Sequence, residues 1–312
     1  MRVLITGANG MLGAELTDYC QQLGYTVIPT GRQPHLIQMD ITEPRTVRAV
    51  FEEYRPEVVF HCAAMTNVDA CEQHPQQAYR VNAFGAEVIA SQCHRVGAIC
   101  VAISTDYVFD GKAGRPYHEY DTPNPLSVYG RSKWLGEQAV QALCPRHYIV
   151  RVAWLYGRFR PSFPQFVLQQ AQAGEKVKAI VDQIGSPTYT YDVAQRLLQL
   201  VQTDAFGVYH LTNRGPVSRY EFARTLLQWA GLPELLEPIP MSAWQTPAPR
   251  PAYSALISWR LEWAQLPPMP TWRDALRRFL KQMGYTAPHD ENAHPAHSDG
   301  NDADDDLHTN SD

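Results

Sequence analysis

The chain has 312 residues, of which 45% are hydrophobic and 19% charged, which is typical of a globular enzyme with one large domain or a domain and a smaller lobe. No apolar run approaches the roughly 20 residues that cross a bilayer, and the short N-terminal run leads into glycines, so we expect neither a membrane span nor a signal peptide. The net charge of −5 arises after position 288, where eight acids occur without Lys or Arg. The remaining 24 acids and 27 bases exclude the strongly basic surface of a nucleic-acid binder.

Six cysteines are scattered along the chain without a Cys-x-x-Cys pair. A chain of this length does not need disulfides for stability, and reduced thiols are the normal state in the cytoplasm. We therefore predict a cytoplasmic protein without a cysteine-bound metal.

Strands and helices alternate over the first 150 residues. Continuous apolar or β-rich runs predict strands at residues 2–6, 26–29, 36–39, 57–62, 98–103 and 148–152. Amphipathic stretches predict helices at residues 11–23, 43–54, 78–96 and 127–143. This alternation predicts an α/β fold with a Rossmann-type, doubly wound parallel sheet.

Beyond Trp154 the pattern loosens and proline becomes frequent, with helices expected at 163–173, 191–203, 218–230 and 271–283. We assign residues 1–160 to a NAD(P)-binding Rossmann domain. Residues 161–285 are assigned to a smaller, mainly substrate-binding C-terminal lobe that is interwoven with it. The acidic stretch 286–312 has few hydrophobic residues and is predicted to be a disordered tail.

A glycine motif follows the first predicted strand and opens the first predicted helix. Gly7, Gly10 and Gly13 are spaced Gly-x-x-Gly-x-x-Gly, with Met11 and Leu12 inside the motif. Glycine permits the tight turn and the close backbone approach that a dinucleotide pyrophosphate requires, and the helix N-terminus attracts the phosphates. We predict that these five residues bind the cofactor.

The adenosine end of the cofactor is expected to lie after the second and third strands. The acidic residue that usually binds the NAD ribose is missing there, and Arg32 stands after the second strand. An arginine at this place pairs with a 2′-phosphate, so NADPH is expected with NADH as the alternative, unless Arg32 is an ordinary loop residue. Asp40 and Ile41 are expected near the adenine.

Three small or flexible side chains follow the fourth predicted strand. Ala63, Ala64 and Met65 are expected to border the cofactor's ribose and pyrophosphate, because the carboxyl ends of parallel strands line the ligand crevice of such folds.

Tyr129 and Lys133 are four residues apart in a predicted helix, so their side chains share one face. Reduction of a ketone needs a proton on oxygen, and a nearby ammonium lowers the high pKa of tyrosine towards neutrality. We predict a catalytic pair in which Lys133 also binds the nicotinamide ribose.

Hydroxyl residues end the fifth predicted strand. Thr105 is the expected catalytic hydroxyl that steadies the developing oxyanion, with Ser104 as its competitor. Asp106 is predicted to bind a substrate hydroxyl, or alternatively to close a turn.

Together these motifs resemble an extended short-chain dehydrogenase/reductase, and in finer detail the dTDP-4-dehydrorhamnose reductase family. The resemblance covers residues 1–285 and is carried by segments 10–16, 63–69, 104–111, 128–133, 151–157, 182–188 and 250–256. The string Ser-Thr-Asp-Tyr-Val-Phe-Asp-Gly at 104–111 is the most specific of them.

The resemblance implies an enzyme that reduces the 4-keto group of dTDP-4-dehydro-L-rhamnose to give dTDP-L-rhamnose. It also implies that Tyr129 donates the proton, that Thr105 assists at the keto oxygen, and that Trp154 packs on the sugar. Many relatives carry an aromatic where Met65 stands here. Some relatives bind magnesium through the glutamate that matches Glu15, but the other ligands have no match, so no metal is predicted.

Two other function classes remain open. One is another sugar-nucleotide enzyme, such as an epimerase, dehydratase or different reductase; Asp106-Tyr107 argues against a dehydratase, which places Asp-Glu after the threonine. The other is a non-catalytic NADP-binding subunit similar to the regulatory subunit of methionine adenosyltransferase. For partners we expect a nucleotide-sugar substrate, no nucleic acid, no membrane, and a monomer or homodimer.

Overall fold

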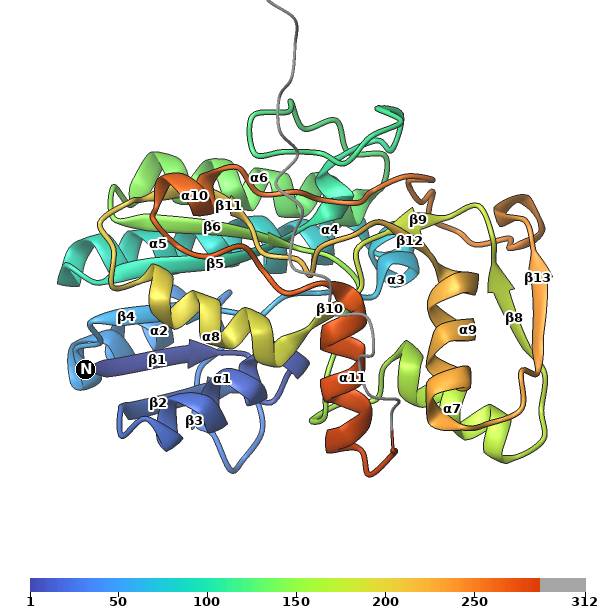
Figure 1. Cartoon of the computed structure of the whole chain (residues 1–312). Coiled ribbons are helices and arrows are strands. Elements are labelled where there is room, and N and C mark those ends of the chain that lie inside the picture. Colours follow the sequence, from blue (N-terminus) through green and yellow to red (C-terminus); the bar gives the residue numbers. More distant parts are fainter. Residues whose placement is uncertain (287–312) are drawn as a thin grey trace, which may run out of the picture.

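Seven parallel strands form the central sheet of the computed structural model, which describes residues 1–286 (Figure 1). Their order across the sheet is β11-β6-β5-β4-β1-β2-β3. The strands are β1 (Arg2–Thr6), β2 (Thr26–Gly31), β3 (Ile37–Gln38), β4 (Val58–His61), β5 (Ile99–Thr105), β6 (His147–Val152) and β11 (Gly207–His210). The chain reverses its direction of travel across the sheet between β1 and β4, which makes a crevice for ligands at their carboxyl ends.

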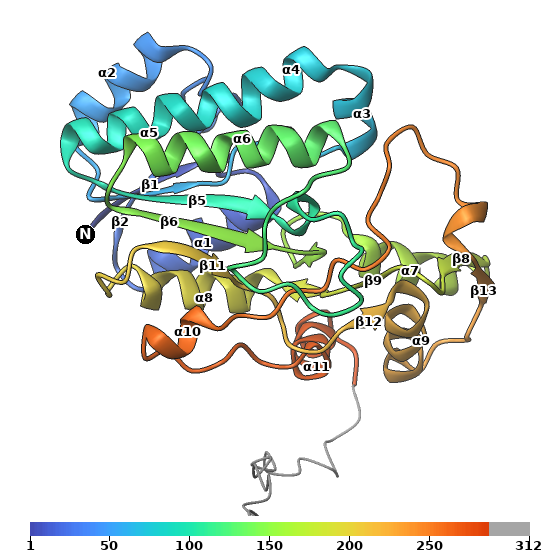
Figure 2. The ribbon, with the colours of Figure 1, turned by 90° about the horizontal axis from the view of Figure 1, so that it is seen from above.

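Helices cover both faces of this sheet (Figure 2). One face carries α2 (Pro44–Tyr54), α5 (Gly85–Val96) and α6 (Val128–Leu143), and the other carries α1 (Met11–Gln22) and α8 (Thr190–Leu200). Because side chains alternate along a strand, Val3 and Ile5 of β1 belong to the core under α1 and α8, whereas Leu4 belongs to the opposite core. Burial on both faces explains why these strands read as continuous apolar runs.

A second, smaller lobe lies beyond one end of the sheet (Figure 1). It contains α7 (Phe163–Gln172), α9 (Arg219–Ala230) and α11 (Trp272–Gln282), and the parallel pair β8 (Val177–Ile180) and β13 (Leu236–Ile239). Its own core is aromatic and includes Tyr156, Phe222, Trp272 and Phe279. A separate core of this kind holds the lobe's helices against one another.

Short strands and helices complete the described chain. Two further strand pairs join β7 (Leu155–Tyr156) to β10 (Thr188–Tyr189) and β9 (Ile184–Gly185) to β12 (Val217–Ser218). The remaining helices are α3 (Val68–Gln73), α4 (Pro75–Tyr79) and α10 (Arg260–Trp263). No helix within residues 1–286 combines the length and apolar character that a membrane span requires.

The predicted fold class is confirmed, with two differences in detail. The segment predicted as a helix at 78–96 is helical throughout, but the helix begins earlier, at Pro75, and contains a π-helical segment, Arg80–Phe84. The sheet also gains β11, which sequence analysis did not predict, and α8 packs against α1. The predicted disordered tail at 286–312 lies, apart from its first residue, outside the described residues.

Candidate active site

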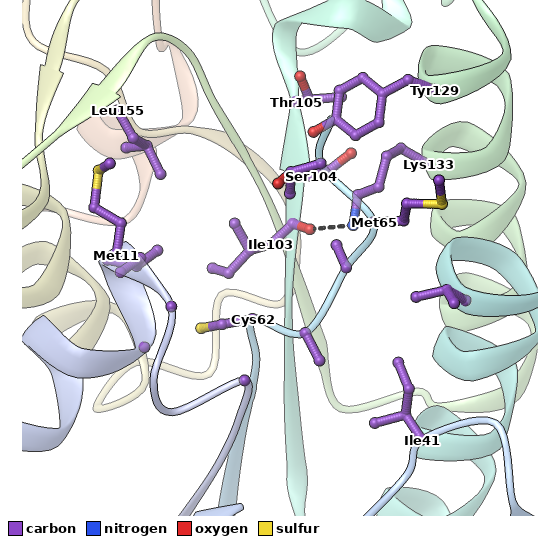
Figure 3. A pocket seen from close by; sticks show the side chains of 18 of the residues that line it. Met11, Ile41, Cys62, Met65, Ile103, Ser104, Thr105, Tyr129, Lys133 and Leu155 are labelled. Atoms are coloured by element: carbon purple, nitrogen blue, oxygen red, sulfur yellow. Dashed lines mark hydrogen bonds between the residues drawn. The ribbon is translucent and has the colours of Figure 1, made fainter. Parts of the chain in front are cut away.

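A cavity of about 1110 Å³ opens at the carboxyl ends of the central strands and reaches the second lobe. It brings together all the residues that the sequence predicted for cofactor, catalysis and substrate. These are Gly7, Gly10, Met11, Leu12, Gly13, Arg32, Asp40, Ile41, Ala63, Ala64, Met65, Thr105, Asp106, Tyr129, Lys133 and Trp154. Figure 3 shows the part of this cavity where the catalytic candidates from β5 and α6 face the glycine loop.

The glycine loop is shaped for a group that approaches the backbone closely. Gly7 has a φ of 63°, and a Cβ there would lie 2.8 Å from the Cα of Ala63. A Cβ on Gly13 would lie only 2.2 Å from the carbonyl oxygen of Gly7, so this glycine lets α1 pack against the turn. No side chain caps α1 at Gly10. The positive end of the helix dipole therefore faces the cavity without a protein anion, which fits a pyrophosphate.

Two arginines lie at the end of the cavity expected for adenosine. Arg32 is exposed beside Asp40, and Arg80 lines the same region while pairing with Glu43 at 2.7 Å. Burial acts to raise the pKa of Asp40, but hydrogen bonds from Thr42 and the charges of Arg32 and Arg80 outweigh it and lower that pKa. Asp40 thus stays ionised, and the guanidinium of Arg32 lies exposed beside it at this end of the cavity. Sequence analysis missed Arg80, which comes from the π-helical segment.

Tyr129 and Thr105 lie next to each other on the wall of the cavity (Figure 3). Burial raises the pKa of Tyr129 above its ordinary value, and a hydrogen bond with the Thr105 hydroxyl opposes that shift. The Tyr129 ring also packs edge-on against Tyr107, with ring centroids 5.6 Å apart. A raised pKa keeps the phenol protonated, which is the form that can act as a general acid.

Lys133 is one turn further along α6. Its ammonium donates a hydrogen bond of 2.7 Å to the carbonyl oxygen of Ile103, and burial lowers the pKa of Lys133 to about 8 (Figure 3). The pKa of Tyr129 is influenced most by burial, by Thr105 and by nearby acidic groups, and Lys133 is not among these influences. The expected lowering of the tyrosine pKa by Lys133 therefore stays a prediction.

A buried ion pair supports this wall from behind, and the sequence did not reveal it. Arg151 of β6 donates to both carboxylate oxygens of Glu137 on α6, at 2.7 and 3.0 Å, and both side chains are 4% exposed. Ser104 donates its hydroxyl to the same carboxylate. Thr105 is the better candidate for the substrate's oxygen, because it lies beside Tyr129 on the wall of the cavity, whereas Ser104 faces Glu137.

Asn82 connects the cofactor side of the cavity to the catalytic helix. Its amide oxygen accepts from the backbone N–H of Met65 at 2.8 Å, and its amide nitrogen donates to the Met65 carbonyl and to Ser132, both at 3.0 Å. Asn82 is buried within the π-helical segment. Asparagine is a poor residue for a helix interior, and this was the one sequence signal that pointed to a special role.

Asp106 is buried behind Thr105. One carboxylate oxygen accepts from the Thr105 hydroxyl at 3.1 Å and the other from Ser254 at 2.5 Å. Burial raises the pKa of Asp106 to about 6. Because both oxygens already accept from protein hydroxyls, direct contact with a sugar hydroxyl stays a prediction.

Trp154 stands where the cavity meets the second lobe. It has a φ of 43°, unusual for a bulky residue, and its ring packs against Gly185, where a Cβ would lie 2.4 Å from the indole. The Arg219 guanidinium lies 4.0 Å from the centre of the indole ring. Backbone strain of this kind is common where a side chain is held for a ligand. Packing of Trp154 on a sugar stays a prediction.

Glu15, in the second turn of α1, is fully buried. Its carboxylate accepts from Thr190 at 2.8 Å and from Arg158 at 3.3 Å. Burial raises the pKa of Glu15, although these two partners oppose the shift. The carboxylate therefore links α1 to the start of α8, and the expected absence of a metal stays a prediction.

The sequence profile of the RmlD substrate binding domain matches residues 1–285 of this chain. The spore coat polysaccharide biosynthesis protein SpsK of Bacillus subtilis is 39% identical over 281 residues, with 90% of this chain and 97% of SpsK covered. The dTDP-4-dehydrorhamnose reductase of Streptomyces griseus is 41% identical over 282 residues, with 88% of this chain and 91% of that enzyme covered.

Solved structures agree with these matches. The dTDP-4-dehydrorhamnose reductase of Bacillus anthracis in complex with NADP has a TM-score of 0.87 at 37% identity, with 90% of this chain and 99% of that one covered. The UDP-glucose 4-epimerase of Thermotoga maritima has a TM-score of 0.79 at 18% identity, a likeness of fold alone.

Proposed function

Because this chain belongs to the RmlD family, we propose that it is an NADPH-dependent reductase of a dTDP-linked 4-keto-6-deoxy sugar, with dTDP-4-dehydro-L-rhamnose as its substrate. The product is then dTDP-L-rhamnose. Relatives named as reductases of this substrate share about 40% identity with nearly the whole chain, which supports the proposal. We infer that the enzyme works in the cytoplasm, as a monomer or homodimer.

One observation carries the proposal: Tyr129 and Thr105 touch at the sheet edge, in the same cavity as an uncapped glycine loop. A ketone placed against these two hydroxyls lies within reach of a nicotinamide whose pyrophosphate occupies the glycine loop. The bound cofactor supplies the hydride that reaches the carbonyl carbon.

The residues of this chain handle the proton. Tyr129 is neutral because burial raises its pKa, so its hydroxyl proton is available for the carbonyl oxygen as that oxygen gains negative charge. Transfer of that proton leaves a phenolate, which the Lys133 ammonium stabilises from the next turn of the helix. The Thr105 hydroxyl, which donates to Asp106 in the structure, turns to the carbonyl oxygen in this proposal and holds it in place.

Lys133 also orients the cofactor in this proposal. An ammonium has three N–H donors, and the Ile103 carbonyl takes one of them. The other two would donate to the ribose hydroxyls beside the nicotinamide when the cofactor is bound. Arg32 and Arg80 are assigned to the 2′-phosphate, because a bidentate guanidinium suits a phosphate.

The test is NADPH oxidation at 340 nm with the keto sugar made in situ from dTDP-glucose by a dehydratase and a 3,5-epimerase. Turnover that requires both upstream enzymes supports the proposal. Turnover without the 3,5-epimerase assigns the enzyme to a dTDP-4-keto-6-deoxy-D-glucose substrate, the substrate named for a Streptomyces niveus relative that is 39% identical. No oxidation with active coupling enzymes overturns the proposal and favours a non-catalytic binding subunit.

A further inference from the structure

Arg219 is a cation of the second lobe that lines the cavity and to which the proposed reaction gives no role. It is the first residue of α9, is partly buried, and its guanidinium carbon lies over the Trp154 ring, 4.0 Å from the ring centre. The ring centre of Phe163 also lies near the Arg219 guanidinium carbon, at 5.4 Å. Two aromatic rings thus fix the guanidinium in one orientation.

The hydrogen bonding of Arg219 is incomplete within residues 1–286. Its Nε donates to the Gln183 side chain at 3.0 Å, but neither terminal amino group has a hydrogen bond or a carboxylate within 4.0 Å in this part of the chain. The other arginine near this end, Arg250, is neutralised by Asp69 at 2.7 Å. Arg219 therefore presents up to four N–H donors and a positive charge to the cavity.

Its location separates it from the cofactor's phosphates. The glycine loop and the α1 N-terminus hold the cofactor end of the cavity, whereas Arg219 interacts electrostatically with Asp106 and Tyr107, at the catalytic end. Burial is the main influence on Arg219 and lowers its pKa, but a guanidinium keeps its proton at any physiological pH. Asp106 attracts this guanidinium without a hydrogen bond to it within residues 1–286, so its free N–H donors suit an anionic group of a ligand.

We propose that Arg219 binds the diphosphate of the sugar-nucleotide substrate. Because the same guanidinium stacks on Trp154, this contact also positions the indole ring on which the sugar is expected to pack. This inference rests on the proposed function, since it assumes a nucleoside diphosphate sugar. A planar, fixed guanidinium matches two phosphate oxygens, and a lysine at the same place does not.

The test is a calorimetric titration of dTDP into the protein saturated with NADP⁺. Arg219→Gln is expected to raise the Kd for dTDP roughly ten- to a hundredfold, the range for a lost charged hydrogen bond. Arg219→Lys is expected to fall between the two, because it keeps the charge and loses the fork. Arg224→Gln is the matched control, since Arg224 is on the same helix, pairs with Glu221 and does not line the cavity.

Two results overturn the inference. One is a Kd for dTDP that Arg219→Gln leaves unchanged; the other is an equal loss of NADPH affinity, which would assign Arg219 to the cofactor. Thermal melting identifies a variant that fails to fold. If Arg219→Gln does not fold, the Kd of Arg219→Lys for dTDP decides the test. The titration needs no turnover, so a wild-type enzyme that reduces the keto sugar, with dTDP binding indifferent to Arg219, defeats this inference and leaves the proposed function intact.

Discussion

Lys133 on α6 donates its 2.7 Å hydrogen bond to the backbone carbonyl of Ile103 on β5, two residues before Thr105. This contact holds the ammonium near the carboxyl end of β5, close to Thr105, whose hydroxyl is expected to contact the substrate. It also fixes the helix that carries Tyr129 relative to that strand. The spacing of the catalytic candidates is therefore determined by backbone as well as by side chains.

Tyr129→Phe is expected to lower kcat by about a hundredfold or more while NADPH binding stays within about twofold. The change removes only the hydroxyl that gives the proton, and general acid catalysis contributes roughly 10²–10⁴ in rate. The fall in kcat is measured as NADPH oxidation at 340 nm, and NADPH binding is measured by fluorescence titration. Tyr120→Phe, an exposed tyrosine outside the cavity, is the control. Turnover near the wild-type rate would remove Tyr129 from the mechanism.

Glu137→Gln is expected to move the basic limb of the pH profile of kcat/KM to lower pH by about one unit. Burial lowers the pKa of Lys133 to about 8, and the Glu137 charge acts against that shift. Without this charge the pKa falls further, so the ammonium is lost earlier as pH rises. The free enzyme's groups determine kcat/KM, so this parameter is the one to measure.

The same variant leaves Arg151 buried without its partner, which typically costs about 3–5 kcal/mol of stability. Melting curves therefore accompany the kinetics, at a temperature where the variant is folded. Glu52→Gln breaks exposed ion pairs with Arg48 and Arg95 and is the control. A basic limb that does not move, in a folded variant, would show that Lys133 does not titrate under the influence of Glu137.

The sequence was informative where function and local structure use the same residues. Gly7 and Gly13 are needed both for the turn and for the phosphate, and Tyr129 and Lys133 need only the helical period to share a face. Such signals are local, and they place the cofactor and catalytic candidates in one cavity. The alternation of runs and periods likewise predicted six of the seven sheet strands.

Contacts between distant segments were beyond sequence analysis. Glu137 and Arg151 are ordinary charged residues until α6 packs on the sheet, and Arg219 reaches the cavity only because α9 lies against it. The strand β11 has only four residues and follows α8, so its place in the sheet depends on pairing with β6. These features are set by tertiary packing, which residue pattern alone does not determine.

As the pH rises from 4 to 7, the Asp106→Asn variant is expected to lose less free energy of unfolding than the wild type does. Burial raises the pKa of Asp106 to about 6 from an ordinary value of 3.8. The folded state thus binds this proton more tightly than the unfolded chain does. The contribution of this proton to the free energy of unfolding is about 3 kcal/mol. It is fully present below pH 3.8 and is lost as the pH rises through 6.

Urea unfolding of wild type and Asp106→Asn at several pH values measures this effect as the difference between the two curves. Carboxylates with lowered pKa, such as Asp69 and Asp121, favour stability at higher pH, but they contribute equally to both proteins and cancel. A difference that does not change between pH 4 and pH 7 would mean that folding does not raise the pKa of Asp106.

Arg32→Ala is expected to raise KM for NADPH roughly tenfold or more and to leave KM for NADH nearly unchanged. The two cofactors differ by one 2′-phosphate, and a guanidinium–phosphate contact at a partly open site contributes about 1.5–3 kcal/mol. Arg45→Ala removes an exposed arginine of α2 that does not line the cavity and controls for net charge. Initial rates with both cofactors at low and high salt complete the measurement, because the Arg32 contact is exposed and salt weakens it. Equal losses for NADPH and NADH would assign Arg32 to the shared adenosine and leave Arg80 as the candidate for the 2′-phosphate.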